Sequence, residues 1–430
     1  MNEEDSEQIG LYLQQIGFHP AASLREAQVL LLNTCSVRKK PEDKAFSLLG
    51  EIALMKNQRQ DLVVGVCGCM AQLRAKEIHQ RAPHVDFVVG TAHIASIPGL
   101  VEEAIQRRKF AQRLDLPERK GAVVTDLPTR DVNRVGKLKA FVPIQYGCDK
   151  FCSFCIVPTT RGRERSRPTA DIVSEVERLA ALGTKEVTLL GQTVNSYGKN
   201  MEEGKVPFSD LLRQVAAVKG IERIRYTSPY PRDFRTDLIE TIRDVPQVME
   251  HCHMPLQSGD NEMLRSMKRL YTRESFGEIL AEMNAKIPGL LITTDLIVGF
   301  PGETEAQFEA TLSAVAEFNF YSSYMFIYSP RPGTPAADQE QLPYALKQRR
   351  LKILADAQFA QTQRMNEAFV GQEFEVLVEG RSEKTPELLR GYSRNFVMTH
   401  FAGDADRLRG ELVTVRVTAG YKWGCMAELI

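Results

Sequence analysis

Six short apolar segments alternate with segments of helical spacing from residue 140 onward, and this alternation restricts the fold more than any other feature. Apolar runs of about four to eight residues between helices are typical of buried parallel strands. Six β/α units predict a partial parallel barrel, whose site lies at the carboxyl ends of the strands. The predicted strands are residues 141–145, 186–191, 223–228, 251–256, 290–299 and 323–328.

A second α/β unit precedes this barrel. Apolar runs at 27–33, 62–66 and 85–90 predict an open parallel sheet, with helices over 41–55 and 71–81 between the strands. In open sheets, ligands lie beyond the carboxyl ends of the strands. Cys35 and Cys69 directly follow the first two strands, so they are candidate metal ligands at that edge.

The last part of the chain changes pattern. A charged helix over 344–369 precedes three segments of period-two alternation, at 373–379, 389–401 and 411–419. They predict a small antiparallel β domain of OB-like size. The predicted organisation, α/β in class, is an N-terminal domain over 1–114, a linker over 115–138, a barrel over 139–366 and a tail domain over 367–430.

The bulk composition, with 43% hydrophobic and 26% charged residues, is that of a soluble globular protein. No stretch approaches the ~20 apolar residues of a membrane span, and the acidic start is unlike a signal peptide. We therefore expect a cytoplasmic protein with no membrane partner. The 8 cysteines are clustered, which suits metal binding in a reducing compartment. Because the net charge is +0, a nucleic-acid partner has to be bound by local basic patches.

Three cysteines, Cys148, Cys152 and Cys155, follow the first barrel strand with C-x3-C-x2-C spacing. Three thiolates on one loop can hold three corners of a cubane 4Fe–4S cluster and leave the fourth iron open. The expected ligand of that iron is S-adenosylmethionine, which predicts a radical enzyme. The alternative is zinc, whose loops usually carry two C-x2-C pairs or Cys/His mixtures. No second pair lies nearby, and His251 and His253 could join only through folding.

Small and polar residues end several other barrel strands and predict one cofactor pocket. A glycine at such a position lets the backbone approach an adenine closely. The candidate cofactor-binding residues are Gly191, Gln192, Asn195, Gln257, Ser258 and Gly299.

Basic residues are concentrated in two places. Guanidinium groups suit carboxylate or phosphate, so an arginine run after the cysteine loop could hold an anionic substrate. The tail carries further basic residues near Tyr392 and Trp423, a mixture that suits RNA, although ordinary strand faces look similar. The candidate substrate-binding residues are Arg161, Arg163, Arg165, Arg167, Arg390, Arg394 and Lys422. Of the remaining cysteines, Cys252 and Cys425 are expected to pack in the core or at the surface. Cys67 shares a strand face with Cys69 and could approach a cluster, but its strand position favours a buried thiol.

The run from Gly147 to Arg167 resembles the signature of the radical S-adenosylmethionine methylthiotransferases, and the resemblance covers essentially the whole chain. Segments 189–198, 255–259, 295–304 and 328–335 match other blocks of that family. The segment Asn33-Thr-Cys-Ser-Val-Arg38 resembles the MiaB-type branch, which acts on isopentenyladenosine in tRNA. Sister branches act on threonylcarbamoyladenosine in tRNA or on a ribosomal-protein aspartate. A non-catalytic zinc and RNA-binding protein is the alternative from another class.

The resemblance implies a methylthiotransferase domain, a radical SAM barrel and a C-terminal TRAM domain that binds tRNA. It implies that the cluster of Cys148, Cys152 and Cys155 reduces S-adenosylmethionine to a deoxyadenosyl radical. This radical takes hydrogen from the adenine carbon between the two pyrimidine-ring nitrogens, at the nucleotide just 3′ of the anticodon. A second 4Fe–4S cluster supplies sulfur, and a second S-adenosylmethionine supplies the methyl group. The implied partners are tRNA, a sulfur donor and an electron donor such as flavodoxin or ferredoxin, and we expect a monomer.

One departure from the family concerns the start of the sequence. The family pattern begins with a strand followed by Gly-Cys-Gln-Met-Asn, and this cysteine is the third ligand of the auxiliary cluster. The printed sequence begins at the Met-Asn, and Cys35 and Cys69 match the other two ligands. Either translation starts earlier, which we favour, or the auxiliary cluster is incomplete. As printed, the chain is expected to load the auxiliary cluster poorly and to have unpaired backbone in its first sheet.

Overall fold

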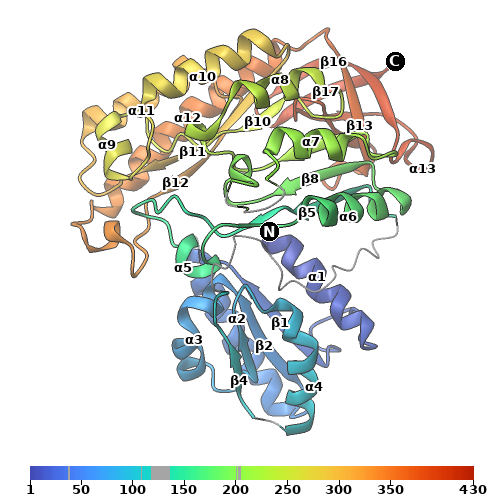
Figure 1. Ribbon diagram of the computed structural model, residues 1–430, viewed down its shortest axis with the longest axis vertical. Coiled ribbons are helices and arrows are strands. Elements are labelled where there is room, and N and C mark those ends of the chain that lie inside the picture. Colours follow the sequence, from blue (N-terminus) through green and yellow to red (C-terminus); the bar gives the residue numbers. More distant parts are fainter. Residues whose placement is uncertain (37–38, 108, 118–135, 200, 202–204) are drawn as a thin grey trace.

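The computed structural model describes residues 1–36, 39–107, 109–117, 136–199, 201 and 205–430 (Figure 1). Most of the predicted linker, and two residues of the segment 33–38, therefore lie outside the described residues. No helix in these ranges is both long enough and apolar enough to cross a lipid bilayer.

The N-terminal unit is a parallel sheet covered on both faces (Figure 1). Adjacent residues of a strand point to opposite faces, so Val63 packs with α1 and α4 while Val64 packs with α2 and α3. The strands, in spatial order, are β1 (Val29–Thr34), β2 (Val63–Gly68), β3 (Phe87–Val89) and β4 (Ala111–Arg113). The helices are α1 (Asn2–Gln15), α2 (Lys39–Gln58), α3 (Cys69–Arg81) and α4 (Ile97–Arg107). β1 forms one edge of this sheet, and the expected weakening of the domain stays a prediction.

The barrel consists of two three-stranded parallel sheets, which confirms the six predicted strands. A parallel bridge between Ile224 and Val248 connects the two halves. The strands are β5 (Lys139–Pro143), β8 (Glu186–Leu190), β9 (Arg223–Tyr226), β10 (His251–His253), β11 (Leu291–Val298) and β12 (Ser322–Ile327). The fourth strand is shorter than the predicted 251–256, because Pro255 has no N–H to donate to a neighbouring strand.

Helices cover the outside of this barrel (Figure 1). Each has an apolar face that packs on the strands; Val176, Leu212 and Phe276 are examples that are fully buried. The helices between successive strands are α6 (Thr169–Ala181), α7 (Phe208–Ala216), α8 (Thr236–Asp244), α9 (Asn261–Ser266), α10 (Arg273–Lys286) and α11 (Glu305–Phe318). α12 (Tyr344–Glu367) follows the last strand and leads to the tail.

The tail is a closed five-stranded barrel rather than a purely antiparallel sheet. The prediction of one strand over 389–401 is wrong, because Phe396 adopts a φ of 71° and the chain turns back there. The barrel closes through a parallel pairing of β15 with β17, which no local pattern indicated. Its strands are β13 (Glu373–Arg381), β14 (Leu389–Ser393), β15 (Met398–Phe401), β16 (Leu412–Tyr421) and β17 (Gly424–Leu429).

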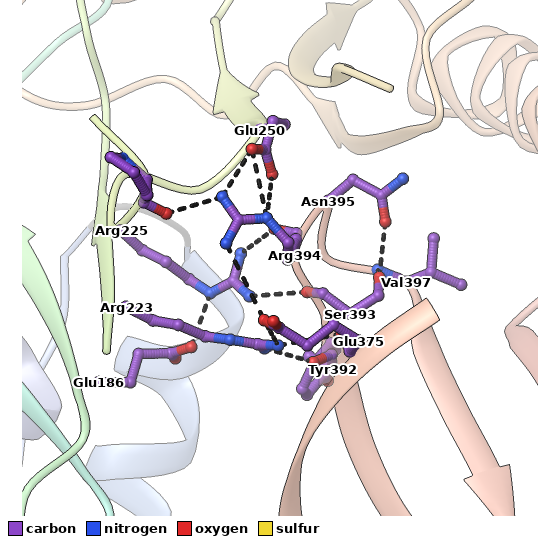
Figure 2. A network of polar contacts seen from close by, with 11 residues as sticks. Glu186, Arg223, Arg225, Glu250, Glu375, Tyr392, Ser393, Arg394, Asn395 and Val397 are labelled. Atoms are coloured by element: carbon purple, nitrogen blue, oxygen red, sulfur yellow. Dashed lines mark hydrogen bonds and ion pairs between the residues drawn. The ribbon is translucent and has the colours of Figure 1, made fainter. Parts of the chain in front are cut away.

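Two arginines of β9 fasten the tail to the barrel (Figure 2). Arg223 donates to the carbonyl oxygens of Tyr392 at 2.6 Å and Glu375 at 3.0 Å. Arg225 donates to the carbonyls of Ser393 at 2.8 Å and Arg394 at 3.1 Å, and it pairs with the Glu186 carboxylate at 3.1 Å. Because β9 begins at Arg223, this junction lies near the amino ends of the barrel strands.

His251 lies at the same junction and makes it sensitive to acid. Its ring stacks on Phe396 at 4.7 Å, and burial together with the charge of Arg225 lowers its pKa well below 6.5. Below pH 6.5 the unfolded chain binds a proton at this residue and the folded chain does not, so acid favours unfolding. We expect the melting temperature to fall less in His251→Gln than in the unsubstituted chain when the pH is lowered from about 8 to about 5. Equal losses in the two proteins would contradict this prediction.

Candidate active site

The three cysteines of the loop lie at the carboxyl end of the first barrel strand, as predicted. The loop follows β6 (Gln145–Tyr146) and returns through α5 (Val157–Arg161) and β7 (Arg165–Ser166). Gly147, with a φ of 73°, lies where these segments cross; a Cβ there would stand 2.2 Å from the carbonyl oxygen of Arg163. Only glycine fits at this crossing, which holds the start of the cysteine loop against the returning chain.

The side chains of Cys148, Cys152 and Cys155 line one pocket, called here the cofactor pocket together with Gln192, Gln257 and Arg269. Burial raises the pKa of the Cys148 thiol to about 11 and that of Cys155 to about 12, and the neighbouring cysteines add to both shifts. The metal-free chain therefore keeps these thiols protonated near neutral pH, and binding of iron has to release their protons.

Within the described ranges, no three His, Cys, Asp or Glu side chains converge closely enough to hold a single metal ion. A cubane places each cysteine sulfur on a different iron. The three cysteines of the loop line the same pocket.

The six predicted cofactor-binding residues divide into two groups. Gln192 and Gln257 line the cofactor pocket, and Gly191 lies between the end of β8 and Gln192. The other three, Asn195, Ser258 and Gly299, make contacts with other residues of the protein. The Asn195 amide exchanges two hydrogen bonds with the backbone of Tyr230, at 2.9 and 2.7 Å.

Ser258 and Gly299 complete the second group. The Ser258 hydroxyl lies 3.3 Å from that of Thr311, and the Gly299 amide donates to the Glu303 carboxylate at 2.7 Å. A Cβ at Gly299 would stand 2.4 Å from the side chain of Lys347. Asn195, Ser258 and Gly299 thus shape the loops around the cofactor pocket but do not line it.

Three of the four arginines that were predicted to hold a substrate are buried in this structure, and their role in substrate binding stays a prediction. Arg161 is buried and pairs with Asp5 at 2.8 Å. Arg167 is buried and pairs with Glu175, also at 2.8 Å, and Arg165 is buried in β7. Only the Arg163 side chain, 48% exposed and paired with Asp149, remains available to a large anion. Desolvating a guanidinium requires compensating partners, and the carboxylates of Asp5 and Glu175 supply them.

The tail candidates divide in a similar way. Arg394 binds both carboxylate oxygens of Glu250, at 2.6 and 2.9 Å, and belongs to the junction rather than to a free surface (Figure 2). Arg390 pairs with Glu383 at 3.0 Å and stays partly exposed. Lys422 lies 5.5 Å from the ring of Trp423, which is 65% exposed. The turn of Lys422 and Trp423 is therefore the part of the tail best suited to stacking on a base.

Cys35 and Cys69 come together at the end of the N-terminal sheet that faces the barrel. Cys35 follows β1 and Cys69 begins α3. Burial raises the pKa of Cys69, the Arg161 guanidinium opposes this shift, and Cys35 adds to it. Because Arg161 ends α5, a short helix that begins two residues after Cys155, the two cysteine sites are neighbours. Cys67, Cys252 and Cys425 are buried, which confirms the expectation for them.

A second, larger cavity opens on the side of the barrel. This lateral cavity, of about 810 Å³, is lined by barrel residues such as His253, Thr293 and Tyr324 and by Tyr392, Lys422 and Trp423 of the tail. Ser228, at the end of β9, lines both this cavity and the cofactor pocket. Aromatic faces and hydrogen-bonding groups together suit a nucleoside.

Sequence reasoning missed three residues of the cofactor pocket, Tyr230, Arg269 and Asp295. Asp295 lies 3.3 Å from His253 and begins a block that had been noticed only as part of a resemblance. Arg269 and Tyr230 lie on loops whose local sequence carries no pattern typical of a site. Both residues are recognised only from contacts between distant segments, such as that of Arg269 with Cys152 and that of Tyr230 with Asn195.

Comparisons with known proteins are consistent with this arrangement. The Radical SAM superfamily matches residues 142–315, and "Uncharacterized protein family UPF0004" matches residues 1–90. The tRNA-2-methylthio-N(6)-dimethylallyladenosine synthase of Moorella thermoacetica is 47% identical over 100% of this chain and 96% of its own length. The protein of the same name from Geobacillus kaustophilus is 44% identical over 100% of this chain and 80% of its own length.

Solved structures share the fold. The radical S-adenosylmethionine methyltransferase TsrM from Kitasatospora setae, solved with cobalamin and a [4Fe-4S] cluster, has a TM-score of 0.59 at 15% identity. The match covers 77% of this chain and 73% of that one.

Proposed function

This chain belongs to the tRNA-2-methylthio-N(6)-dimethylallyladenosine synthase family, and we propose that it adds a methylthio group to the adenine ring of isopentenyladenosine 3′ of the tRNA anticodon. The observation that carries this proposal is the pairing of two cavities. A pocket with three cysteines adjoins a nucleoside-sized lateral cavity, and Ser228 lines both.

The radical SAM superfamily implies a 4Fe–4S cluster and S-adenosylmethionine. We assign the cluster to Cys148, Cys152 and Cys155, and the sulfonium ligand to the pocket wall at Gln192 and Gln257. When bound, these groups supply the radical chemistry that a C–H bond of adenine requires. The protein orients the ligand through the two amides and keeps water from it by the burial of the loop.

The lateral cavity is the proposed nucleoside site. Tyr324 and Trp423 offer exposed aromatic faces to a base, and Lys422 and Arg163 offer charge to the phosphates of the anticodon loop. We further propose an electron donor such as flavodoxin or ferredoxin and a separate sulfur donor as partners. We also propose that the protein acts on tRNA as a monomer in the cytoplasm.

We propose an auxiliary 4Fe–4S cluster at Cys35 and Cys69, with Arg161 beside it. The chain is expected to bind iron for one full cluster, about four atoms, after anaerobic reconstitution, because two cysteines hold an auxiliary cluster poorly. Iron analysis of the chain and of a Cys35→Ala/Cys69→Ala variant measures this, and the two should differ little. Two full clusters per chain would refute the expectation of poor loading.

Nucleoside mass spectrometry of tRNA from a deletion strain tests the function. Methylthio-isopentenyladenosine should disappear, isopentenyladenosine should accumulate, and a plasmid copy should restore the modification. Loss of methylthio-threonylcarbamoyladenosine instead would assign the chain to a sister branch. A colourless protein that contains zinc after anaerobic purification would favour the non-catalytic alternative, since zinc does not absorb visible light.

A further inference from the structure

Arg269 contacts a cysteine of the proposed cluster directly. Its Nη1 donates to the Cys152 Sγ at 3.3 Å, its Nε donates to the Tyr271 hydroxyl at 2.7 Å, and its Nη2 donates to the Pro255 carbonyl at 3.2 Å. The guanidinium is partly buried in the wall of the cofactor pocket. Three partners in three directions fix its orientation, with one edge toward the sulfur.

Two aromatic rings lie close to the guanidinium. Its central carbon lies 4.8 Å from the ring centroid of Tyr230 and 5.0 Å from that of Tyr271. Such rings orient and attract a cation but carry no charge that would neutralise it. In the part of the chain that the structure describes, Arg269 forms no ion pair with a carboxylate.

The other charged groups of the cofactor pocket do have opposite partners. Lys150, the other cation, pairs with Asp233, and the Asp295 carboxylate lies 3.3 Å from the His253 ring. Among the described residues of the cofactor pocket, Arg269 is thus the cation that is not paired with a carboxylate. Its positive charge can therefore act on a group bound in the pocket. Thiolate-bound iron–sulfur clusters carry net negative charge, and hydrogen bonds to their sulfurs help to set the reduction potential.

We propose that Arg269 is a positioning residue that donates to Cys152 as a cluster ligand and makes the cluster easier to reduce. The inference rests on the assignment of Cys148, Cys152 and Cys155 to the cluster under the proposed function. Reduction adds an electron to a group that is already anionic, so a fixed cation at hydrogen-bond distance stabilises the reduced form more than the oxidised form.

The test is a redox titration followed by electron paramagnetic resonance on the full chain. A Cys35→Ala/Cys69→Ala background leaves only the barrel cluster. Arg269→Gln should lower the ratio of reduced to oxidised cluster about tenfold at a fixed potential, which is about 59 mV for one electron. Arg269→Lys keeps the charge and should stay within about threefold of the background. Arg265→Gln removes a charge from the exposed last turn of α9, outside the cofactor pocket, and should behave like the background.

Each other outcome has a defined meaning. An unchanged ratio in Arg269→Gln overturns the proposal, and so does an equal shift in Arg265→Gln, which would indicate a general effect of losing a positive charge. If Arg269→Gln holds no iron, retention of the cluster in Arg269→Lys supports a requirement for charge, and loss in both overturns it. Absence of a cluster from the background protein itself would instead overturn the proposed function.

Discussion

Replacement of Cys152 by alanine is expected to abolish formation of the methylthio nucleoside while the chain stays folded. The cofactors carry the difficult chemistry, so loss of one cluster ligand should lower the rate at least about 10³-fold. Formation of the modified nucleoside in reconstituted protein measures the rate, and visible absorbance measures the cluster. Cys148→Ala and Cys155→Ala should behave in the same way, because all three side chains line the same pocket.

Cys252 provides the matched control. It is fully buried in β10 and lies outside the cofactor pocket, so Cys252→Ala removes a cysteine without removing a proposed ligand. This variant should keep its cluster and most of its activity. Full activity in Cys152→Ala, or equal losses in the two variants, would contradict the assignment of the cluster.

Replacement of Arg225 by alanine is expected to destabilise the junction between barrel and tail by about 3–5 kcal/mol. The side chain is 6% exposed, and its removal leaves the buried Glu186 carboxylate and the carbonyls of Ser393 and Arg394 without this donor (Figure 2). An unpaired buried charge accounts for most of the cost. The chain has 1 Trp, Trp423 in the tail, so the urea midpoint followed by its fluorescence reports on this domain.

Arg416 is the control for this prediction. It pairs with Glu373 on the tail surface at 3.0 Å, and its side chain is 46% exposed. Exposed pairs contribute about 0–1 kcal/mol, so Arg416→Ala should leave the midpoint almost unchanged. A similar midpoint for Arg225→Ala and Arg416→Ala would show that the β9 arginines do not hold the tail.

The sequence was most informative where the deciding residues are close together along the chain. The cysteine loop and the six barrel strands depend on spacing within short segments, and both are found where they were predicted. The arginines show the opposite case. Arg161 and Arg163 look alike in sequence, but Asp5, which is 156 positions from Arg161, decides that Arg161 is buried.

Long-range partners also explain the errors in the tail. Arg394 was assigned to RNA, yet its partner Glu250 lies 144 positions away in the barrel. The parallel pairing of β15 with β17 joins strands separated by all of β16, and alternation within a strand says nothing about its neighbour. Arg269 contacts Cys152 across 117 positions, so no local pattern could have identified it.

The barrel strands form two separate three-stranded sheets, and two cavities open on this barrel. Ser228 lines both the cofactor pocket and the lateral cavity. Under the proposed assignment, the sulfonium ligand and the RNA occupy two different cavities that meet at this residue. We therefore expect steady-state kinetics without a compulsory order of addition.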